Sequence, residues 1–369
     1  MRLALMSGAY KNAGDFLIEK RCSQIITHLF PDCIIETYKR CDIEEQFEKI
    51  HKTDVIVFCG GPLYLREPSA NVPMERLLDR IEKPMMIIGG GWFGKDNSSQ
   101  LPYNYHFSEF GKAFFNQIDN QGFGLSCRDY PTYKVLKNEG FKNVFLTGCP
   151  AWYNLEFLDK TDIVNSQKEI KKICISDPAQ RMNCESAVLI TDLLKRRYPE
   201  AQITFVFHRG IEADKYTGEK EAAEHRKMVR ALEALEITIA DISYNMDGFS
   251  IYDNIDLHLG FRVHAHIYCL SRRQRTVLIE EDGRGAGVDE TLGLPSLIAY
   301  NDQLYTNNRY VLKGMSMLGK RTNPNLVREI ENYLNLLQDT DDLYLKNAFS
   351  AMKSYYLNMT KYINQLTCL

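Results

Sequence analysis

The sequence predicts an α/β fold made of two doubly wound parallel sheets that face a cleft. Short apolar segments alternate with amphipathic helical segments along most of the 369-residue chain, which is typical of parallel sheets covered by helices on both faces. After a polar stretch at 160–169 the same alternation starts again. We therefore expect an N-terminal α/β domain at 1–160, a second α/β domain at 161–325, and two helices at 326–369 that pack back on the body.

Composition and charge exclude several classes of protein. The formal net charge of −3 gives no reason to expect nucleic-acid binding. Ten cysteines are scattered without a C-x-x-C pair, and some, such as Cys59 and Cys174, lie in apolar patterns where a thiol acts as a small hydrophobe. The first ten residues hold too short an apolar run for a signal peptide, and no segment is long enough to span a bilayer. We therefore expect a cytoplasmic protein without a metal site.

The first domain is predicted to contain six short strands with helices between them. The segment DVIVF is apolar throughout its middle, as a central parallel strand requires. Residues 16–29 and 130–138 show helical patterns. The six predicted strands are residues 3–6, 33–37, 54–58, 85–88, 122–127 and 144–146.

The turns after these strands carry candidate cleft residues. The first strand runs through a glycine-containing turn into a helix, a layout that binds phosphate in many α/β proteins. Asn12 and Asp15 lie in that turn, although Asn12 also suits turn geometry and Asp15 a helix cap. Gly60 and Gly61 follow the third strand, where glycine either lets backbone approach a ligand or forms a tight turn.

Three more candidates follow in the first domain. Tyr103 and His106 precede a helix with regularly spaced phenylalanines, and they are candidates for lining the cleft, whereas the phenylalanines are expected in the core. Arg128 follows the fifth strand and is followed by Asp129. It therefore either faces a ligand at the sheet edge or pairs with Asp129, which also suits the cap of the next helix.

The second domain repeats the pattern. His208 lies at a strand's carboxyl end, where a cleft position and an ordinary loop position are equally expected. Helices are predicted at 187–197 and 217–235. The predicted strands are residues 172–176, 203–207, 237–239, 255–259 and 275–279.

The strongest signal lies in the last βαβ unit of this domain. Arg262 and His264 start a helix just past a strand's carboxyl end, and Arg284 lies in a glycine-rich loop predicted at 282–287 after the next strand. Each of these three features also has an ordinary explanation. Arg262 could pair with Asp256 at the surface, His264 could be a half-buried histidine, and the segment around Arg284 could be a flexible loop. Together, at neighbouring strand ends, an imidazole flanked by two guanidiniums favours a small, multiply charged anion.

The run Arg262-Val263-His264-Ala265, six residues after Asp256, resembles the polysaccharide pyruvyl transferase family. The G-x-x-x-N-x-G-D spacing from Gly8 to Asp15, the Gly60-Gly61 pair and the Arg128-Asp129 pair resemble the same family. The family usually has a lysine where this chain has Arg284, and a planar guanidinium does not replace an ammonium ion in every geometry.

This resemblance implies a glycosyltransferase-B-like fold and the transfer of pyruvate from phosphoenolpyruvate to a sugar of a bacterial cell-surface polysaccharide precursor. It implies no cofactor beyond this co-substrate and no metal. The implied acceptor is a sugar or a lipid-linked oligosaccharide, which would bring a cytoplasmic protein to the inner face of the membrane. By the resemblance, His264 is the general acid or a phosphate ligand, and the donor's anionic groups are bound by Arg128, Arg262 and Arg284. The candidate acceptor or cleft residues are Asn12, Asp15, Gly60, Gly61, Tyr103, His106 and His208.

Two other functions stay open at this point. A glycosyltransferase of the same fold would bind the diphosphate of a nucleotide sugar, and Glu280 or Glu281 is the candidate contact to its ribose. A non-catalytic relative would bind a glycan without turning it over.

Overall fold

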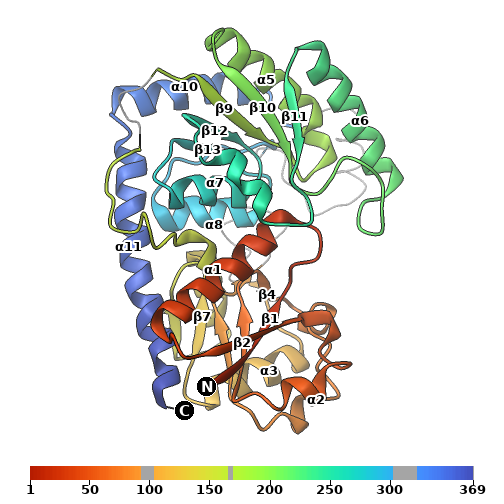
Figure 1. Ribbon diagram of the computed structural model, residues 1–369, viewed down its shortest axis with the longest axis vertical. Coiled ribbons are helices and arrows are strands. Elements are labelled where there is room, and N and C mark those ends of the chain that lie inside the picture. Colours follow the sequence, from red (N-terminus) through yellow and green to blue (C-terminus); the bar gives the residue numbers. More distant parts are fainter. Residues whose placement is uncertain (93–103, 165–168, 302–321, 369) are drawn as a thin grey trace.

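The computed structural model describes residues 1–92, 104–164, 169–301 and 322–368 (Figure 1). Two α/β units are stacked along the long axis of the molecule, and the last long helix, Leu343–Ile363, runs down one side of both. Tyr103, one of the predicted acceptor residues, lies outside the described residues.

The first unit is built on a parallel sheet of order β2-β1-β3-β5. Its central strand β3 is buried along its whole length, as its apolar sequence predicts. Two small parallel pairs, β4 with β6 and β7 with β8, extend this unit. Its strands are β1 (Arg2–Ser7), β2 (Ile34–Lys39), β3 (Val55–Cys59), β4 (Pro62–Tyr64), β5 (Met85–Ile88), β6 (Gly91–Trp92), β7 (Leu125–Cys127) and β8 (Val144–Leu146). Its helices are α1 (Ala13–Leu29), α2 (Phe47–Ile50), α3 (Glu109–Asn120) and α4 (Tyr130–Asn138).

The second unit is built on a five-stranded parallel sheet of order β11-β10-β9-β12-β13. The chain adds strands on one side of β9 and then, from β12 onward, on the other side. Its strands are β9 (Lys172–Ser176), β10 (Gln202–Phe207), β11 (Thr238–Asp241), β12 (Leu257–Gly260) and β13 (Thr276–Leu278). Its helices are α5 (Cys184–Arg197), α6 (Glu219–Ala234), α7 (Val263–Ser271) and α8 (Gly283–Leu292).

The segment predicted as a glycine-rich loop at 282–287 is instead the first turns of α8, and this prediction was wrong. Asp282 caps the helix by accepting a hydrogen bond from the backbone N–H of Arg284 (2.9 Å). Glycine serves here for close packing, because a Cβ on Gly287 would lie 3.0 Å from the carboxyl carbon of Asp129. The short strands β4 and β6 were also missed, because their glycine-rich surroundings read as turns.

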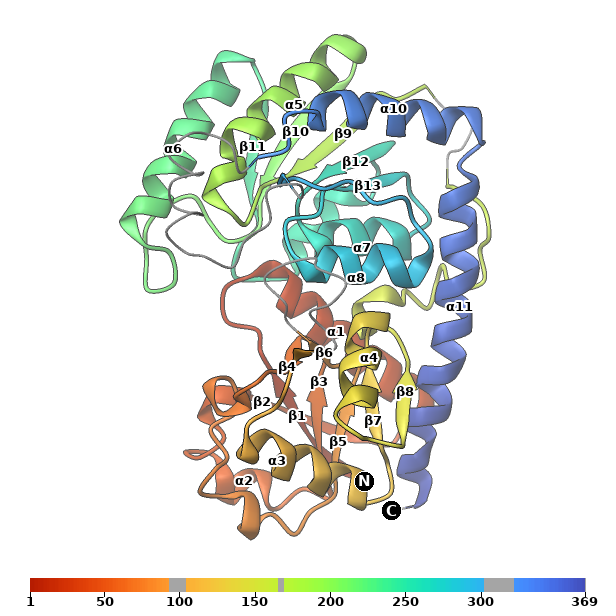
Figure 2. The same cartoon turned by 180° about the vertical axis from the view of Figure 1, so that it is seen from behind.

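The C-terminal helix α10 (Leu326–Asp339) packs against α5 of the second unit, whereas α11 (Leu343–Ile363) spans both units. Figure 2 shows α11 beside the second unit at one end and beside β8 at the other. Near its end, Asn358 donates to the carbonyl of Leu146 (3.2 Å) and the Tyr362 hydroxyl donates to that of Gly124 (3.1 Å). No helix among the described residues combines the length and apolar character that a membrane span requires.

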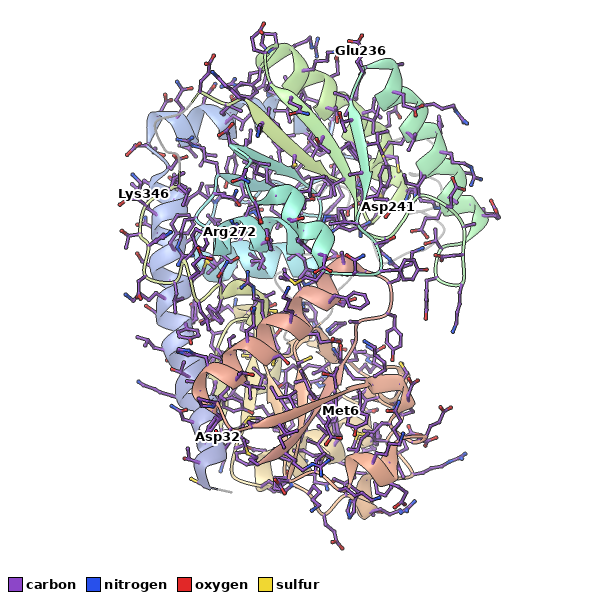
Figure 3. The ribbon with its side chains drawn as sticks, in the orientation of Figure 1. Met6, Asp32, Glu236, Asp241, Arg272 and Lys346 are labelled. Carbon is purple, nitrogen blue, oxygen red and sulfur yellow. The ribbon has the colours of Figure 1, made fainter. Side chains whose placement is uncertain are left out.

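The carboxyl ends of the second sheet point toward the first unit. Figure 3 shows this along β11, with Glu236 just before its outer end and Asp241 at its inner end. The turn from β1 to α1 approaches from the opposite side, and the backbone N–H of Ala13 donates to the carbonyl of His208 (3.2 Å). The loops that follow parallel strands therefore meet between the two units.

Candidate functional site between the two units

In each sheet there is one point where the chain stops adding strands on one side and starts adding them on the other, and both points face the junction between the two units. In the second sheet this place lies between β9 and β12, and Gly260 at the end of β12 lies directly against Ser176 at the end of β9. A Cβ on Gly260 would lie 2.4 Å from the Ser176 hydroxyl oxygen, so only glycine allows this approach. In the first sheet the reversal lies between β1 and β3. Ligands of open α/β sheets bind at such points.

Two cavities adjoin at this junction. The larger has a volume of about 490 Å³, within the range of small-molecule sites. The smaller has about 30 Å³, room for little more than a water molecule. Asn12 and Arg284 line both cavities, whereas His264, Arg262 and His208 line the smaller one only. The larger cavity is further lined by Tyr10, Lys11, Asp15, Arg40, Arg209 and Tyr216.

Arg262 does not pair with Asp256, as one sequence-based alternative held, but with the fully buried Asp177 after β9. Its Nε lies 2.7 Å from Asp177 Oδ1, and its Nη2 donates to Asp177 Oδ2 and to the carbonyl of Pro178. This bidentate pair satisfies most of the guanidinium and fixes the start of α7 beside β9. Arg262 therefore lines the smaller cavity mainly as a positioned charge.

His264 lies in the first turn of α7, with its ring against the first turn of α1. A Cβ on Gly14 would lie 2.1 Å from His264 Nδ1, so the glycine makes this contact between the units sterically allowed. Burial lowers the pKa of His264 to about 3, and the charges of Arg284, Arg128 and Arg262 add to this effect. The imidazole is therefore neutral at pH 7 when no anion is bound.

Arg284 projects from the start of α8 and is about one-third exposed. Its Nη2 lies 2.6 Å from Asp282 Oδ2, and its Nε contacts both oxygens of the same carboxylate. Because it lines both cavities, this is the cation that a ligand at their junction would meet. The backbone amides that start α7 and α8 add partial positive charge at this point.

Arg128 is buried beside the site and lines neither cavity. Its Nε donates to Asp129 (2.8 Å) and its Nη2 to the carbonyl of Trp92 (2.9 Å). Asp129 in turn caps α4 through the backbone N–H of Thr132 (2.9 Å). The structure therefore places Arg128 within electrostatic reach of His264 but not at a cavity wall.

Asn12 and Asp15 bring the first unit to the junction. Asn12, not Asp15, caps α1, and this leaves the Asp15 carboxylate beside the larger cavity. Burial raises the pKa of Asp15, while Arg40, Arg284 and Arg209 act in the opposite direction. A carboxyl group thus faces cations from both units.

Gly60 and Gly61 form a backbone cradle rather than an open cavity floor. Both have positive φ angles, 47° and 70°. The carbonyls of Cys59 and Gly60 accept hydrogen bonds from Arg40 Nη2 at 3.2 and 3.1 Å. The backbone of Cys59 and Gly60 therefore holds the Arg40 guanidinium, and Gly61 leaves room for it. The sequence pattern did not point to Arg40.

The two candidate histidines outside α7 have different positions. His208 is fully buried at the smaller cavity, where its Nε2 lies 2.8 Å from the Tyr252 hydroxyl and burial lowers its pKa. His106 is largely exposed, and its Nδ1 lies 2.6 Å from Glu139 at the end of α4. It lines neither of these cavities, so the structure does not place it with the other candidates.

The sequence pattern did not point to several residues that lie at the junction. Asp177 holds Arg262, and the buried Lys11 reaches across to the second unit, where its Nζ contacts Asp214 and Thr217 at 2.6 Å each. The available signal was their location, since Asp177 and Arg40 each follow the carboxyl end of a strand. Among the residues that the structure describes, no group of three His, Cys, Asp or Glu side chains is arranged to hold a metal ion.

Three solved structures illustrate the fold that this chain shares. UDP-GlcNAc 2-epimerase from Neisseria meningitidis, bound to UDP-GlcNAc, matches at 12% identity and a TM-score of 0.50 over 100% of both chains. Medicago truncatula UGT71G1, complexed with UDP-glucose, matches at 9% identity and 0.50 over 99% of this chain and 98% of that one. A Listeria monocytogenes protein assigned as a UDP-N-acetylglucosamine 2-epimerase gives 9% and 0.53 over 100% and 94%. These likenesses establish a glycosyltransferase-B-type architecture.

The sequence itself points to a narrower group. No curated protein matches the chain. A sequence model of the family described as polysaccharide pyruvyl transferase matches residues 12–283, well over half of the chain. The matched segment starts at Asn12 and ends at Gly283, next to Arg284, so it spans the site from its first-unit side to the start of α8. The chain therefore belongs to the polysaccharide pyruvyl transferase family.

Proposed function

We propose that this protein transfers a pyruvyl group from phosphoenolpyruvate to two hydroxyls of a sugar in a bacterial cell-surface polysaccharide precursor, forming a ketal and releasing phosphate. Family membership supports a transferase that acts in polysaccharide pyruvylation. The observation that carries the proposal is the environment of His264, a neutral imidazole surrounded by the charges of three arginines at the junction of the units. Such a group gains a proton when a multiply charged anion binds beside it.

The donor is placed at the junction of the two cavities. The smaller cavity is too small for the whole molecule, so phosphoenolpyruvate lies at its mouth against Arg284 and Asn12. Arg284 and the amides that start α7 and α8 bind its anionic groups. Arg262, held by Asp177, and Arg128, held by Asp129, contribute charge rather than direct contacts in this arrangement.

The proposed reaction has two additions and one departure. Protonated His264 gives its proton to the methylene carbon of phosphoenolpyruvate, and positive character develops on the carbon that bears the phosphate. One sugar hydroxyl attacks that carbon, and Asp15 accepts its proton. The second hydroxyl then displaces phosphate with cleavage of the carbon–oxygen bond, and the phosphate leaves with the second hydroxyl's proton. The ketal keeps one new methyl hydrogen, so the proton first supplied by His264 is balanced by the one that Asp15 receives.

Calorimetric binding of phosphoenolpyruvate without acceptor tests this proposal. Wild-type protein should bind it saturably, with uptake of a proton near pH 7.5 that appears as different heats in buffers of different ionisation enthalpy. Arg284→Met should weaken binding by about tenfold or more, because a charge-assisted contact is lost. The exposed Arg196→Met is the matched control and should bind normally.

A glycosyltransferase that uses a nucleotide sugar is the second candidate. The observation in its favour is that two structures of the same fold hold UDP sugars. Against it, Glu281 is buried and accepts hydrogen bonds from the N–H groups of Ala179 (2.6 Å) and Gln180 (3.0 Å) and the side chain of Asn183 (2.6 Å), so it is not available to a ribose. Saturable binding of UDP, with none of phosphoenolpyruvate, would transfer the assignment to glycosyl transfer. Failure to bind either ligand, even with sugars present, would favour a non-catalytic relative.

A further inference from the structure

Two guanidiniums at the larger cavity have no carboxylate partner among the residues that the structure describes. Arg40 comes from the first unit, just after β2, and Arg209 from the second, just after β10. Neither guanidinium has a nitrogen within 4.0 Å of a carboxylate oxygen of any residue that the structure describes. The Nε atoms of both are buried and lack a hydrogen-bond partner there.

Arg40 is held in a specific orientation although no carboxylate among the described residues forms an ion pair with it. Arg40 is 5% exposed, and its Nη2 donates hydrogen bonds to the carbonyls of Cys59 and Gly60. Two glycines enclose it, because a Cβ on Gly8 or Gly61 would lie 2.7 or 2.9 Å from Nη2. Burying a cation without a counter-charge is costly, so a preformed guanidinium socket of this kind indicates an anionic ligand.

The other cations of the cavity already have partners. Lys11 pairs with Asp214 at 2.6 Å, and Arg284 pairs with Asp282. Asp15 is the acidic group on the cavity wall, and burial raises its pKa. The described wall therefore carries two positive charges without an ion-pair partner, Arg40 and Arg209, against at most one negative charge, that of Asp15. At least one positive charge is left in excess, and a phosphate would neutralise it.

We propose that Arg40 and Arg209 form a phosphate-binding subsite, and that the acceptor enters the cleft as a sugar linked to a phosphate or diphosphate group. The subsite rests on the two arginines alone, whereas its assignment to the acceptor rests on the proposed pyruvyl transfer. Planar guanidiniums bind phosphate oxygens in pairs, and a group held between them contacts both units at once. Acceptor binding would then also hold the cleft closed.

The donor and acceptor could each supply a phosphate, and the position of the two arginines favours the acceptor. The donor site proposed above lies at the mouth of the smaller cavity, against Arg284 and Asn12 and toward His264, and neither Arg40 nor Arg209 lines that smaller cavity. The larger cavity also presents the rings of Tyr10 and Tyr216, 6.4 Å apart, as an apolar wall for the ring of a sugar. Its volume of about 490 Å³ leaves room for a sugar and its phosphate.

Calorimetric binding of inorganic diphosphate to the full chain tests the subsite without knowledge of the acceptor sugar. Wild type should bind diphosphate saturably in the presence of saturating phosphoenolpyruvate. Arg209→Met should weaken this by about tenfold to a hundredfold, as expected for loss of a charge-assisted contact, and leave phosphoenolpyruvate affinity within about threefold. Arg209 is preferred to Arg40 because its side chain holds no described backbone carbonyl, so its replacement spares the fold. The exposed Arg196→Met serves as the matched control.

Each other outcome has one meaning. If wild type binds no diphosphate, or if Arg209→Met binds it as tightly as wild type, the subsite is refuted. If phosphoenolpyruvate simply displaces diphosphate and both need Arg209, the phosphate belongs to the donor and the acceptor assignment fails. If diphosphate binds through Arg209 while phosphoenolpyruvate does not bind at all, the subsite stands and the proposed function fails.

Discussion

Replacement of Gly14 by alanine tests whether the position of the His264 imidazole controls the reaction. The added methyl group would lie 2.1, 2.4 and 2.7 Å from Nδ1, Cγ and Cβ of His264, so the whole side chain is in the way, not only its end. The shortest contact must lengthen from 2.1 Å to at least the 3.4 Å of ordinary van der Waals contact, a shift of about 1.3 Å.

A shift of this size should abolish most of the activity while sparing the fold. Misplacement of a reacting group by about 1 Å costs about a hundredfold in rate, so we expect kcat for phosphate release to fall by about a hundredfold or more. Alanine stabilises a helix by about 0.5–1 kcal/mol relative to glycine, which offsets part of the strain in α1. Thermal unfolding should therefore show a change of only a few degrees, and phosphoenolpyruvate binding should lose its proton uptake.

The matched control is Gly218→Ala at the cap of α6, because a Cβ there meets nothing within 4 Å. It should keep wild-type turnover. If Gly14→Ala turned over phosphoenolpyruvate within about twofold of wild type, the placement of His264 against α1 would have no part in catalysis, and the reasoning from this contact would be refuted.

Three further predictions concern stability. Asp177→Asn should lower the free energy of unfolding by about 3–5 kcal/mol, because the buried guanidinium of Arg262 loses its counter-charge. Adding Arg262→Met should restore part of that free energy in denaturant unfolding, and no restoration would argue against the ion pair as the cause. Arg273 is buried and donates to three backbone carbonyls, so Arg273→Ala should lower the free energy of unfolding by about 3 kcal/mol or more. An unchanged melting temperature would contradict this prediction. Burial lowers the pKa of His266 to about 3, below its value in the unfolded chain. Between pH 6.5 and pH 3 the unfolded chain therefore binds a proton that the folded chain does not. The free energy of unfolding therefore decreases as the pH is lowered through this range. His266→Gln should remove about 2 kcal/mol of the loss between pH 8 and pH 5; equal losses in both proteins would show that His266 is not buried neutral.

The sequence predicted those parts of the fold that depend on local pattern. The bounds of β5 (Met85–Ile88) and α4 (Tyr130–Asn138) agree with the prediction, because an apolar run and a capping aspartate are local signals. The start of α8 was missed because Gly283, Gly285 and Gly287 read as a loop. Gly285 allows the close approach of Glu280 and Gly287 that of Asp129, and Asp129 is distant in the chain.

For the site, the sequence by itself determined the family, the carboxyl-end location of Arg262, His264 and Arg284, and the parallel α/β pattern that brings such ends together. Only the tertiary structure decided which charges are available. It pairs Arg262 with Asp177, 85 residues away, and it holds Arg40 between glycines without an ion-pair partner among the described residues. The physical reason is that burial and pairing, which set the pKa of an imidazole and the availability of a guanidinium, depend on contacts between segments that no local pattern connects.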